Sequence, residues 1–245
     1  MSLFGRAFAD GDRLEVAGAV VRLKIHSRAR RVSLRLDRTR REIVATAPSA
    51  RRLGEAAAFA RNRAAWIAER LAELPETAPL HPGLTLEVFG EPVRLEASLG
   101  RARWIEATHD QPARICAMGE GEGYARAVIL ILRKRALALL GERTAHYAGR
   151  LGAPMPKVAI MDAKGRWGSC RPGSRGGPGS IRYSWRLALA PFAVADYVAA
   201  HECAHLLELN HGPQFWAHVK ALVGDERGHR AWLRAEGARL HAFGR

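Results

Sequence analysis

Alternating apolar and polar positions in the first third of the chain predict β-strands. Residues 20–25, 32–36 and 43–47 alternate in this way and are joined by basic connectors, which indicates short antiparallel strands. Residues 50–74 carry their apolar side chains toward one side at helical spacing, and prolines follow at 75 and 79. We therefore expect a small sheet followed by one helix.

Further strands and a long helix are expected in the middle of the chain. Residues 84–89 and 93–97 flank Gly90–Glu91 and predict a β-hairpin. Weaker strands are expected at 102–107 and 113–117, before a break marked by glycines. The pattern then predicts a long helix over 124–151.

The last hundred residues mix short strands with helices. The expected elements are a strand at 157–161, a loop at 165–179, a strand at 180–187, and helices at 191–205, from 213, and at 229–242. The whole pattern predicts an α+β fold, divided into a β-rich N-terminal domain with a helix, residues 1–119, and a second domain, residues 120–245.

The bulk composition is that of a soluble globular protein. Hydrophobic residues make up 48% of the chain and charged residues 26%. The longest apolar run, residues 127–132, is far shorter than the roughly 20 residues needed to span a bilayer, so we expect no membrane partner. Asp10 and Asp12 lie where a secretory signal would be apolar, and the three cysteines form no CxxC pair. We therefore expect a cytoplasmic protein.

The formal net charge is +15, and many of the cations lie between residues 22 and 41. Such a stretch suits a polyanion such as nucleic acid, or an acidic substrate. It is also typical of strand edges that face solvent, where charged side chains keep the protein soluble. We prefer the second interpretation, because no aromatic residue is interleaved with these arginines to stack on bases.

The segment His201-Glu202-Cys203-Ala204-His205 is a HExxH motif. Residues four apart lie nearly over each other on a helix, so both imidazoles project from one face and suit a zinc ion. Glu202 is turned around the helix and can activate a zinc-bound water as a general base. The alternative is a helix that carries two histidines by chance. The almost uncharged approach at 192–200 favours a buried metal site, because polar groups buried without partners cost about 1–3 kcal/mol each.

A catalytic zinc site usually has three protein ligands, and His211 is our choice for the third. On an unbroken helix His211 would be rotated about 120° away from the metal face. The chain must therefore turn back near Asn210, which tolerates the left-handed conformation, before Gly212–Pro213. The other candidates for the third ligand are Glu208, His218 and His229. Glu208 could instead orient a ligand histidine.

The spacing of the three histidines equals that of the metzincin pattern HExxHxxGxxH. Glu208 stands at the position of its glycine, and all four methionines lie upstream of the motif. The metzincin interpretation therefore fails.

Several segments together resemble the YgjP-like metallopeptidases (the DUF45 group), bacterial relatives of the SprT-like zinc peptidases. They are RWGSC at 166–170, IR at 181–182, WRL at 185–187, Pro191, DYV at 196–198, HECAH at 201–205 and NHGPQFW at 210–216. The strong resemblance covers about residues 156–223. It implies a minimal zincin-like catalytic domain with a small sheet and a HExxH helix. It also implies one catalytic zinc held by His201, His205 and His211, with Glu202 as the base and a peptide or protein as the substrate.

The chain departs from the family's usual pattern at Cys203 and Ser184, neither of which is an expected metal ligand. Cys203 is expected to be a small buried residue, whereas Ser184 puts one cleft contact in doubt. We expect Phe215 and Trp216 to anchor the second helix in the core.

The role of the WGSC segment, residues 167–170, is open. It could form the mouth of the cleft with Cys170 near the zinc, but we prefer a tight glycine turn with a packed tryptophan. A strand edge at 157–161 or 180–187 could bind a peptide by strand addition. The candidates for oxyanion stabilisation are Tyr183, Arg166 and His229.

Three functions fit the sequence. The leading one is a zinc metallopeptidase. A second is a zinc- or divalent-metal-dependent hydrolase of a phosphate-containing small molecule such as a nucleotide, although the chain has no P-loop motif. The third is a nucleic-acid-binding module with structural zinc, which is disfavoured because structural sites are usually rich in cysteine. A DNA-stimulated protease would combine the first and the third.

Overall fold

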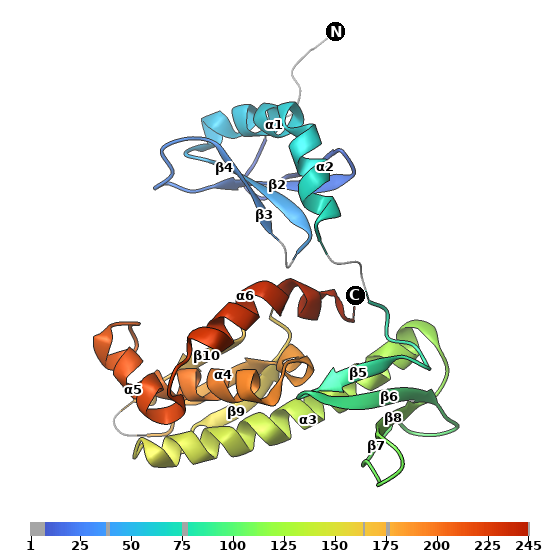
Figure 1. The fold of residues 1–245 in the computed structure, drawn as a ribbon. Helices are drawn as coiled ribbons and strands as arrows, with labels where there is room; N and C mark the ends of the chain where they lie inside the picture. The colour runs from blue at the N-terminus through green and yellow to red at the C-terminus, as the bar shows by residue number, and fades with distance from the viewer. Residues whose placement is uncertain (1–7, 38–39, 75–77, 164, 175–176, 245) are drawn as a thin grey trace. The chain divides into compact units, whose positions relative to one another are not determined.

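The computed structural model describes residues 8–37, 40–74, 78–163, 165–174 and 177–244. The fold mixes helices with several small sheets, as an α+β fold requires (Figure 1). The chain divides into two compact units, Met1–Glu76 and Thr77–Arg245.

The boundary between the units lies at 76/77 and not at the expected 119/120. The sheet that follows residue 77 belongs to the second unit because its apolar face packs into the same core as the long helix. Leu86 and Val93 of that sheet share one buried cluster with Tyr124 and Val128 of the helix.

The first unit is built on a four-stranded sheet with the order β1-β2-β4-β3. Its strands are β1 (Arg13–Val16), β2 (Ala19–Ile25), β3 (Ser33–Asp37) and β4 (Glu42–Ala47). The strands after β1 were expected, but the expected antiparallel arrangement is only partly correct. β4 lies between β2 and β3, and it pairs with β3 in antiparallel and with β2 in parallel.

The helix expected at 50–74 is interrupted. A short 3-10 turn (Ala50–Arg52) leads into α1 (Leu53–Asn62), and α2 (Ala64–Ala72) begins after Arg63, whose φ of −110° and ψ of 24° are not helical. Leu53 and Ile67 bury one side of these helices against Leu23 and Ile43 of the sheet.

The second unit begins with another four-stranded sheet of order β5-β6-β8-β7. Its strands are β5 (Thr85–Val88), β6 (Glu91–Ala97), β7 (Arg103–Ile105) and β8 (Ala113–Ala117). The hairpin β5–β6 was expected, but its turn lies one residue before the expected Gly90–Glu91, because Glu91 already pairs with Val88. Phe89 and Gly90 form its two-residue turn with φ of 56° and 92°, the two positive values of a type I′ turn.

The long helix α3 (Gly121–Arg150) is followed by a three-stranded sheet. β9 (Lys157–Met161), β10 (Gly168–Arg171) and β11 (Ser180–Ser184) are ordered β10-β11-β9, with β11 in the centre. β9 and β11 lie where strands were expected, although β11 gives way to a 3-10 helix at Trp185–Leu189. β10 lies inside the segment expected to be a loop.

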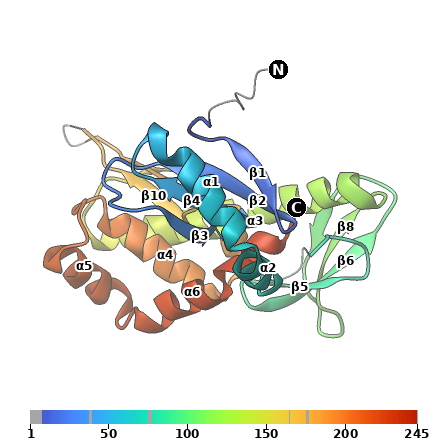
Figure 2. The ribbon, with the colours of Figure 1, turned by 90° about the horizontal axis from the view of Figure 1, so that it is seen from above.

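Three helices complete the second unit: α4 (Phe192–Ala204), α5 (Pro213–Val223) and α6 (Arg227–Ala242). α4 contacts α3, α5, α6 and β10, and Figures 1 and 2 show it between α3 and α6. Asp196, the one charged residue of its approach, accepts hydrogen bonds from Arg143 Nε at 2.6 Å and Tyr147 Oη at 2.7 Å. α4 is therefore tied to α3 by a charged contact as well as by apolar packing. No helix in the described part of the chain is long and apolar enough to cross a membrane.

Candidate metal centre

The centre is built where α4 ends. His201 and Glu202 lie in its last turn, and His205 is its C-terminal cap residue. The amide of Gly212 donates to the carbonyl of Asn210 at 2.7 Å, and α5 begins one residue later. The reversal needs no left-handed residue, since Asn210 has no positive φ, contrary to the expectation. This tight turn brings His211 back over the end of the helix.

Three imidazoles converge at this point. One ring nitrogen from each of His201, His205 and His211 lies within 4.8 Å of the other two. The Nε2 atoms of His201 and His211 are 3.2 Å apart. Two nitrogen lone pairs at this distance need a proton or a cation between them. Two nitrogen ligands at about 2.0–2.1 Å from a tetrahedral zinc would be about 3.3 Å apart, so the arrangement fits this metal.

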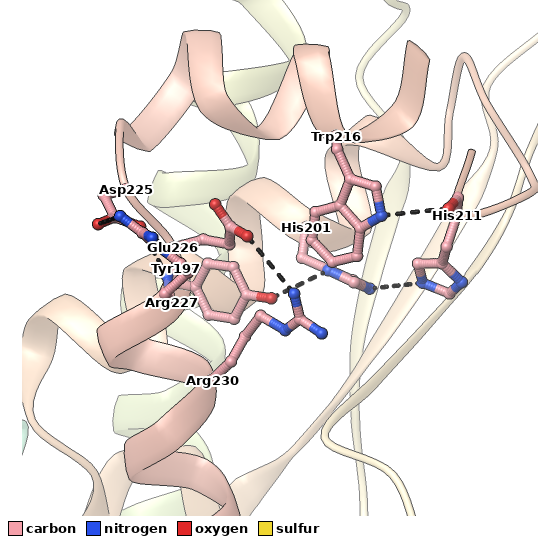
Figure 3. A network of polar contacts seen from close by, with 8 residues as sticks. All are labelled: Tyr197, His201, His211, Trp216, Asp225, Glu226, Arg227 and Arg230. Carbon is pink, nitrogen blue, oxygen red and sulfur yellow. Dashed lines mark hydrogen bonds and ion pairs between the residues drawn. The ribbon is translucent and has the colours of Figure 1, made fainter. Parts of the chain in front are cut away.

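The second nitrogen of each α4 histidine has a partner that orients the ring. His205 Nδ1 lies 2.8 Å from the carbonyl oxygen of Glu208, to which an Nδ1–H donates, and this leaves Nε2 free as a ligand. His201 Nδ1 lies 3.3 Å from the hydroxyl of Tyr197, one turn earlier on α4 (Figure 3). Glu208 thus orients a histidine as considered from the sequence, but it does so through its backbone carbonyl.

Two aromatic residues of α5 support the cluster. Phe215 is fully buried, with its ring 4.5–4.9 Å from the rings of all three histidines. Trp216 Nε1 donates to the carbonyl oxygen of His211 at 3.1 Å, as Figure 3 shows. Phe215 is therefore the core anchor expected of it, and partly exposed Trp216 also fixes the backbone of His211.

The site favours neutral imidazoles. Burial, together with the neighbouring His205 and His211, lowers the pKa of His201 to about 3. Burial and His205 also lower the pKa of His211. Neutral imidazole is the form that binds a metal, so these histidines are ready to act as ligands near pH 7.

Glu202 lies beside the histidines and is only 6% exposed. Burial raises the pKa of its carboxyl group to about 7, while the charge of Arg166 acts in the opposite direction. Its side chain lies against Gly168 of β10, where an added Cβ would be 2.6 Å from the Glu202 Cδ atom. The glycine therefore gives the carboxylate the space that it occupies.

A cavity of about 420 Å³ opens over the site. Its walls come from residues before and within β10, from α4 and the turn after it, and from α6: Arg166, Trp167, Gly168, Ser169, Cys170, Tyr197, Val198, His201, Glu202, His205, Leu209, His211 and Leu233. The WGSC segment thus belongs to the cavity wall, and its last three residues form the start of β10, so the preferred interpretation as a tight turn is wrong. Its tryptophan does pack as expected, stacked on His241 with ring centroids 4.9 Å apart.

A sequence model of the YgjP-like metallopeptidase domain matches residues 30–236. The chain belongs to the YgjP-like family. The match extends well beyond residues 156–223, where the resemblance was strongest, and it takes in most of both units. Searches of curated proteins and of solved structures found no match. Membership of the YgjP-like family supports a metal-dependent peptidase that acts on a peptide or protein.

Other candidate residues of this YgjP-like site differ in where they lie. Among the described residues, the cluster able to hold a metal consists of His201, His205 and His211, without Glu208, His218 or His229. Of the oxyanion candidates, Arg166 lines the cavity. Tyr183 is fully buried with its hydroxyl 2.8 Å from that of Thr144, and His229 stacks on Tyr197 at 5.6 Å. Neither lines the cavity.

The structure also shows where Cys170, Cys203 and Ser184 lie. Cys170 lines the cavity, but burial raises the pKa of its thiol to about 12, which disfavours a thiolate. Cys203 is fully buried, as expected. Ser184 is buried too, and its hydroxyl accepts from the amide of Arg186 at 3.4 Å, so it is no cleft contact.

Two contacts of the site were not expected from the sequence, that of Tyr197 with His201 and that of Gly168 with Glu202. Tyr197 belongs to the DYV segment of the resemblance without an assigned role, although its position four residues before His201 places both side chains on one helix face. Nothing in the sequence alone placed Gly168 against Glu202.

Proposed function

We propose that the chain is a zinc peptidase in which His201, His205 and His211 hold one Zn²⁺ and Glu202 is the general base. The observation that carries the proposal is the convergence of three imidazole nitrogens within 4.8 Å of one another, next to a buried carboxylate and under an open cavity.

The donor set favours zinc over other divalent ions. It consists of three imidazoles without a carboxylate or thiolate, which suits zinc better than the oxygen-seeking Mg²⁺ and Ca²⁺. Three protein ligands leave a position for water or substrate on the cavity side, as catalytic zinc sites require. When bound, zinc lowers the pKa of water and polarises a carbonyl oxygen.

Glu202 handles the proton. Its carboxylate takes a proton from the attacking water and later gives it to the nitrogen of the leaving amine. A pKa of about 7, raised by burial, suits both transfers near neutral pH, because the group is neither too weak a base nor too weak an acid.

Strand β10 offers the substrate a place to bind. It pairs with β11 on one side and is an edge strand of its sheet, and its residues line the cavity. An extended peptide that adds to this edge would lie alongside the histidines. The edges considered from the sequence were 157–161 and 180–187, but β11 is the central strand and β9 does not line the cavity.

Metal content and casein turnover test the proposal on the same samples. We expect about one zinc in the wild type and in Glu202→Gln, much less in His211→Ala, and turnover in the wild type alone. Equal turnover in Glu202→Gln would remove the base assignment. Equal zinc in His211→Ala would remove the ligand assignment.

A further inference from the structure

A second groove lies beside the metal cavity, on the three-stranded sheet. It has a volume of about 450 Å³ and a lining that includes four cationic residues, Lys157, Arg166, Arg171 and Arg182. We refer to this hollow as the cation groove. Its other lining residues are neutral: Ala159, Ser169, Cys170, Ser180 and Ile181.

The strand register explains why three of these cations share one face. Arg171 of β10 lies opposite Ser180 of β11, which lies opposite Lys157 of β9. Residues opposite one another in a sheet project from the same face, and residues two apart along a strand do so as well. Arg182, two residues after Ser180 and opposite Ser169, therefore joins them on that face.

These cations are not used to hold the fold together. None of the four forms an ion pair with a carboxylate in the part of the chain that the structure describes. Arginines elsewhere in the second unit are paired, such as Arg143 with Asp196 and Arg186 with Asp162. Arg166 also acts on the nearby carboxylate of Glu202, but the described residues place no such carboxylate in an ion pair with Lys157, Arg171 or Arg182. Like charges gathered in this way repel one another, so the arrangement favours binding of an anion.

The cation groove and the metal cavity meet at β10. Arg166, Ser169 and Cys170 line both hollows. Gly168 lies against Glu202, so the strand presents one face to the catalytic carboxylate, while Arg171 belongs to the groove on the other face. A peptide that extends the sheet along the edge of β10 sends alternate side chains to the two faces.

The geometry points to the cation groove as a subsite for acidic side chains of the substrate. Aspartate or glutamate at alternate positions of the bound peptide meets Arg171 on the adjoining strand and Arg182 one strand further in, while the residues between them face the metal cavity. Lys157, on the far strand β9, adds its positive charge at longer range. Guanidinium groups bind carboxylates through paired hydrogen bonds, which adds direction to the attraction. The inference rests on the proposed peptidase function, because the same strand edge holds the substrate.

A peptide fits the groove better than a nucleic acid does. Single-stranded nucleic acids bind where aromatic side chains lie beside cations and stack on the bases. No aromatic residue belongs to the lining of the groove. The neighbouring strand edge, in contrast, supplies the backbone pairing that an extended peptide uses.

Three quenched fluorescent peptides on one scaffold test the subsite. They carry glutamate, glutamine or lysine at the same alternate positions, and kcat/KM is measured with the full-length, zinc-loaded protein at low and high salt. We expect the glutamate peptide to be cleaved roughly tenfold better than the glutamine peptide, and the lysine peptide worst. The preference should shrink at high salt, because exposed charges are screened. Equal rates for the three peptides would overturn the inference.

Variants link the preference to the groove. Arg182→Glu should lower the ratio of glutamate to glutamine cleavage roughly three- to tenfold, because attraction becomes repulsion at one site. Arg101→Glu is the matched control, since it makes the same charge reversal at an exposed arginine that lines neither hollow, and it should leave the ratio unchanged. A ratio that Arg182→Glu does not alter would contradict the assignment.

Binding separates failure of the subsite from failure of the peptidase. The same peptides, without quencher, are titrated against Glu202→Gln and followed by fluorescence anisotropy. If the wild type cleaves nothing while the glutamate peptide binds more tightly than the others, the peptidase proposal fails and the subsite stands. If a labelled oligothymidylate binds more tightly than the glutamate peptide, and Arg182→Glu abolishes this binding, the groove is a nucleic-acid site and the inference fails.

Discussion

Gly168 and Glu202 occupy adjoining space so closely that a side chain at position 168 cannot coexist with the carboxylate where it lies. An added Cβ would be 2.5 Å from the Cγ atom and 2.6 Å from the Cδ atom of Glu202. The strand that borders the cavity therefore also sets the position of the proposed base. Gly168 is therefore a part of the site that a substitution can test.

The change Gly168→Ala should displace the Glu202 side chain and lower kcat roughly 100-fold, since misplacement of a reacting group by about 1 Å has effects of this size. Zinc content should remain near that of the wild type, because the atoms nearest to the new methyl group belong to Glu202 and not to a proposed zinc ligand. Steady-state turnover and metal analysis check both points. Gly141→Ala on α3 is the control, since an added Cβ there meets nothing within 4 Å, and it should leave turnover unchanged.

Tyr197→Phe should weaken zinc binding while the fold is kept. The variant removes the hydroxyl that lies 3.3 Å from His201 Nδ1 but keeps the ring that stacks on His229. Loss of a partner that orients a ligand histidine typically lowers metal affinity 10- to 100-fold. Competition with a chromophoric chelator measures the zinc Kd.

Tyr183→Phe provides the comparison, because its hydroxyl is buried against Thr144 and does not line the cavity. It should lower stability without changing the zinc Kd. An equal Kd in the wild type and in Tyr197→Phe would show that the hydroxyl does not hold His201.

The chemistry of the site follows from short-range spacing, which is why the sequence predicts so much of it. His201 and His205 converge because four residues make about one helical turn, and the break at Gly212–Pro213 lets His211 return. The turn itself differs from the expected one: a bond between Gly212 and Asn210 replaces a left-handed asparagine.

Long-range pairing is what the sequence leaves undetermined. β10, with the sequence GSCR, has no apolar alternation and is a strand because it pairs with β11. β4 carries the expected strand pattern, but that pattern does not reveal that it inserts beside β2 in parallel. The boundary at 76/77 depends on which core the apolar face of β5 and β6 joins, and periodicity does not encode this.

Glu202→Gln should stabilise the metal-free protein at alkaline pH. Burial raises the pKa of Glu202 in the folded state to about 7, above its ordinary value of 4.5. The folded state therefore holds this proton more tightly than the unfolded state. The contribution of the group to stability is fully present below about pH 4.5 and is lost as the pH rises through 7.

We expect the variant to be more stable than the wild type by about 1–3 kcal/mol at pH 8, and the difference to vanish near pH 4.5. Urea unfolding in the presence of a chelator measures it across this range. The lowered pKa of His201 affects both proteins alike and cancels in the difference. A difference that does not depend on pH would show that Glu202 titrates normally.

Asp196→Asn should loosen the attachment of α4 to α3. Asp196 accepts from Arg143 at 2.6 Å and from Tyr147 at 2.7 Å, with only 17% of its side chain exposed. An asparagine keeps the size but removes the charge, so the free energy of unfolding should fall by about 1–3 kcal/mol, as measured by urea unfolding. Zinc stoichiometry of the folded variant should stay near that of the wild type, because the contact lies outside the cavity lining.

Asp225→Asn is the control. It breaks the exposed contact with Arg227 and should leave the unfolding midpoint unchanged, since solvent already screens that pair. An equal loss in both variants would mean that the partly buried contact contributes no more to the attachment of α4 than an exposed ion pair does.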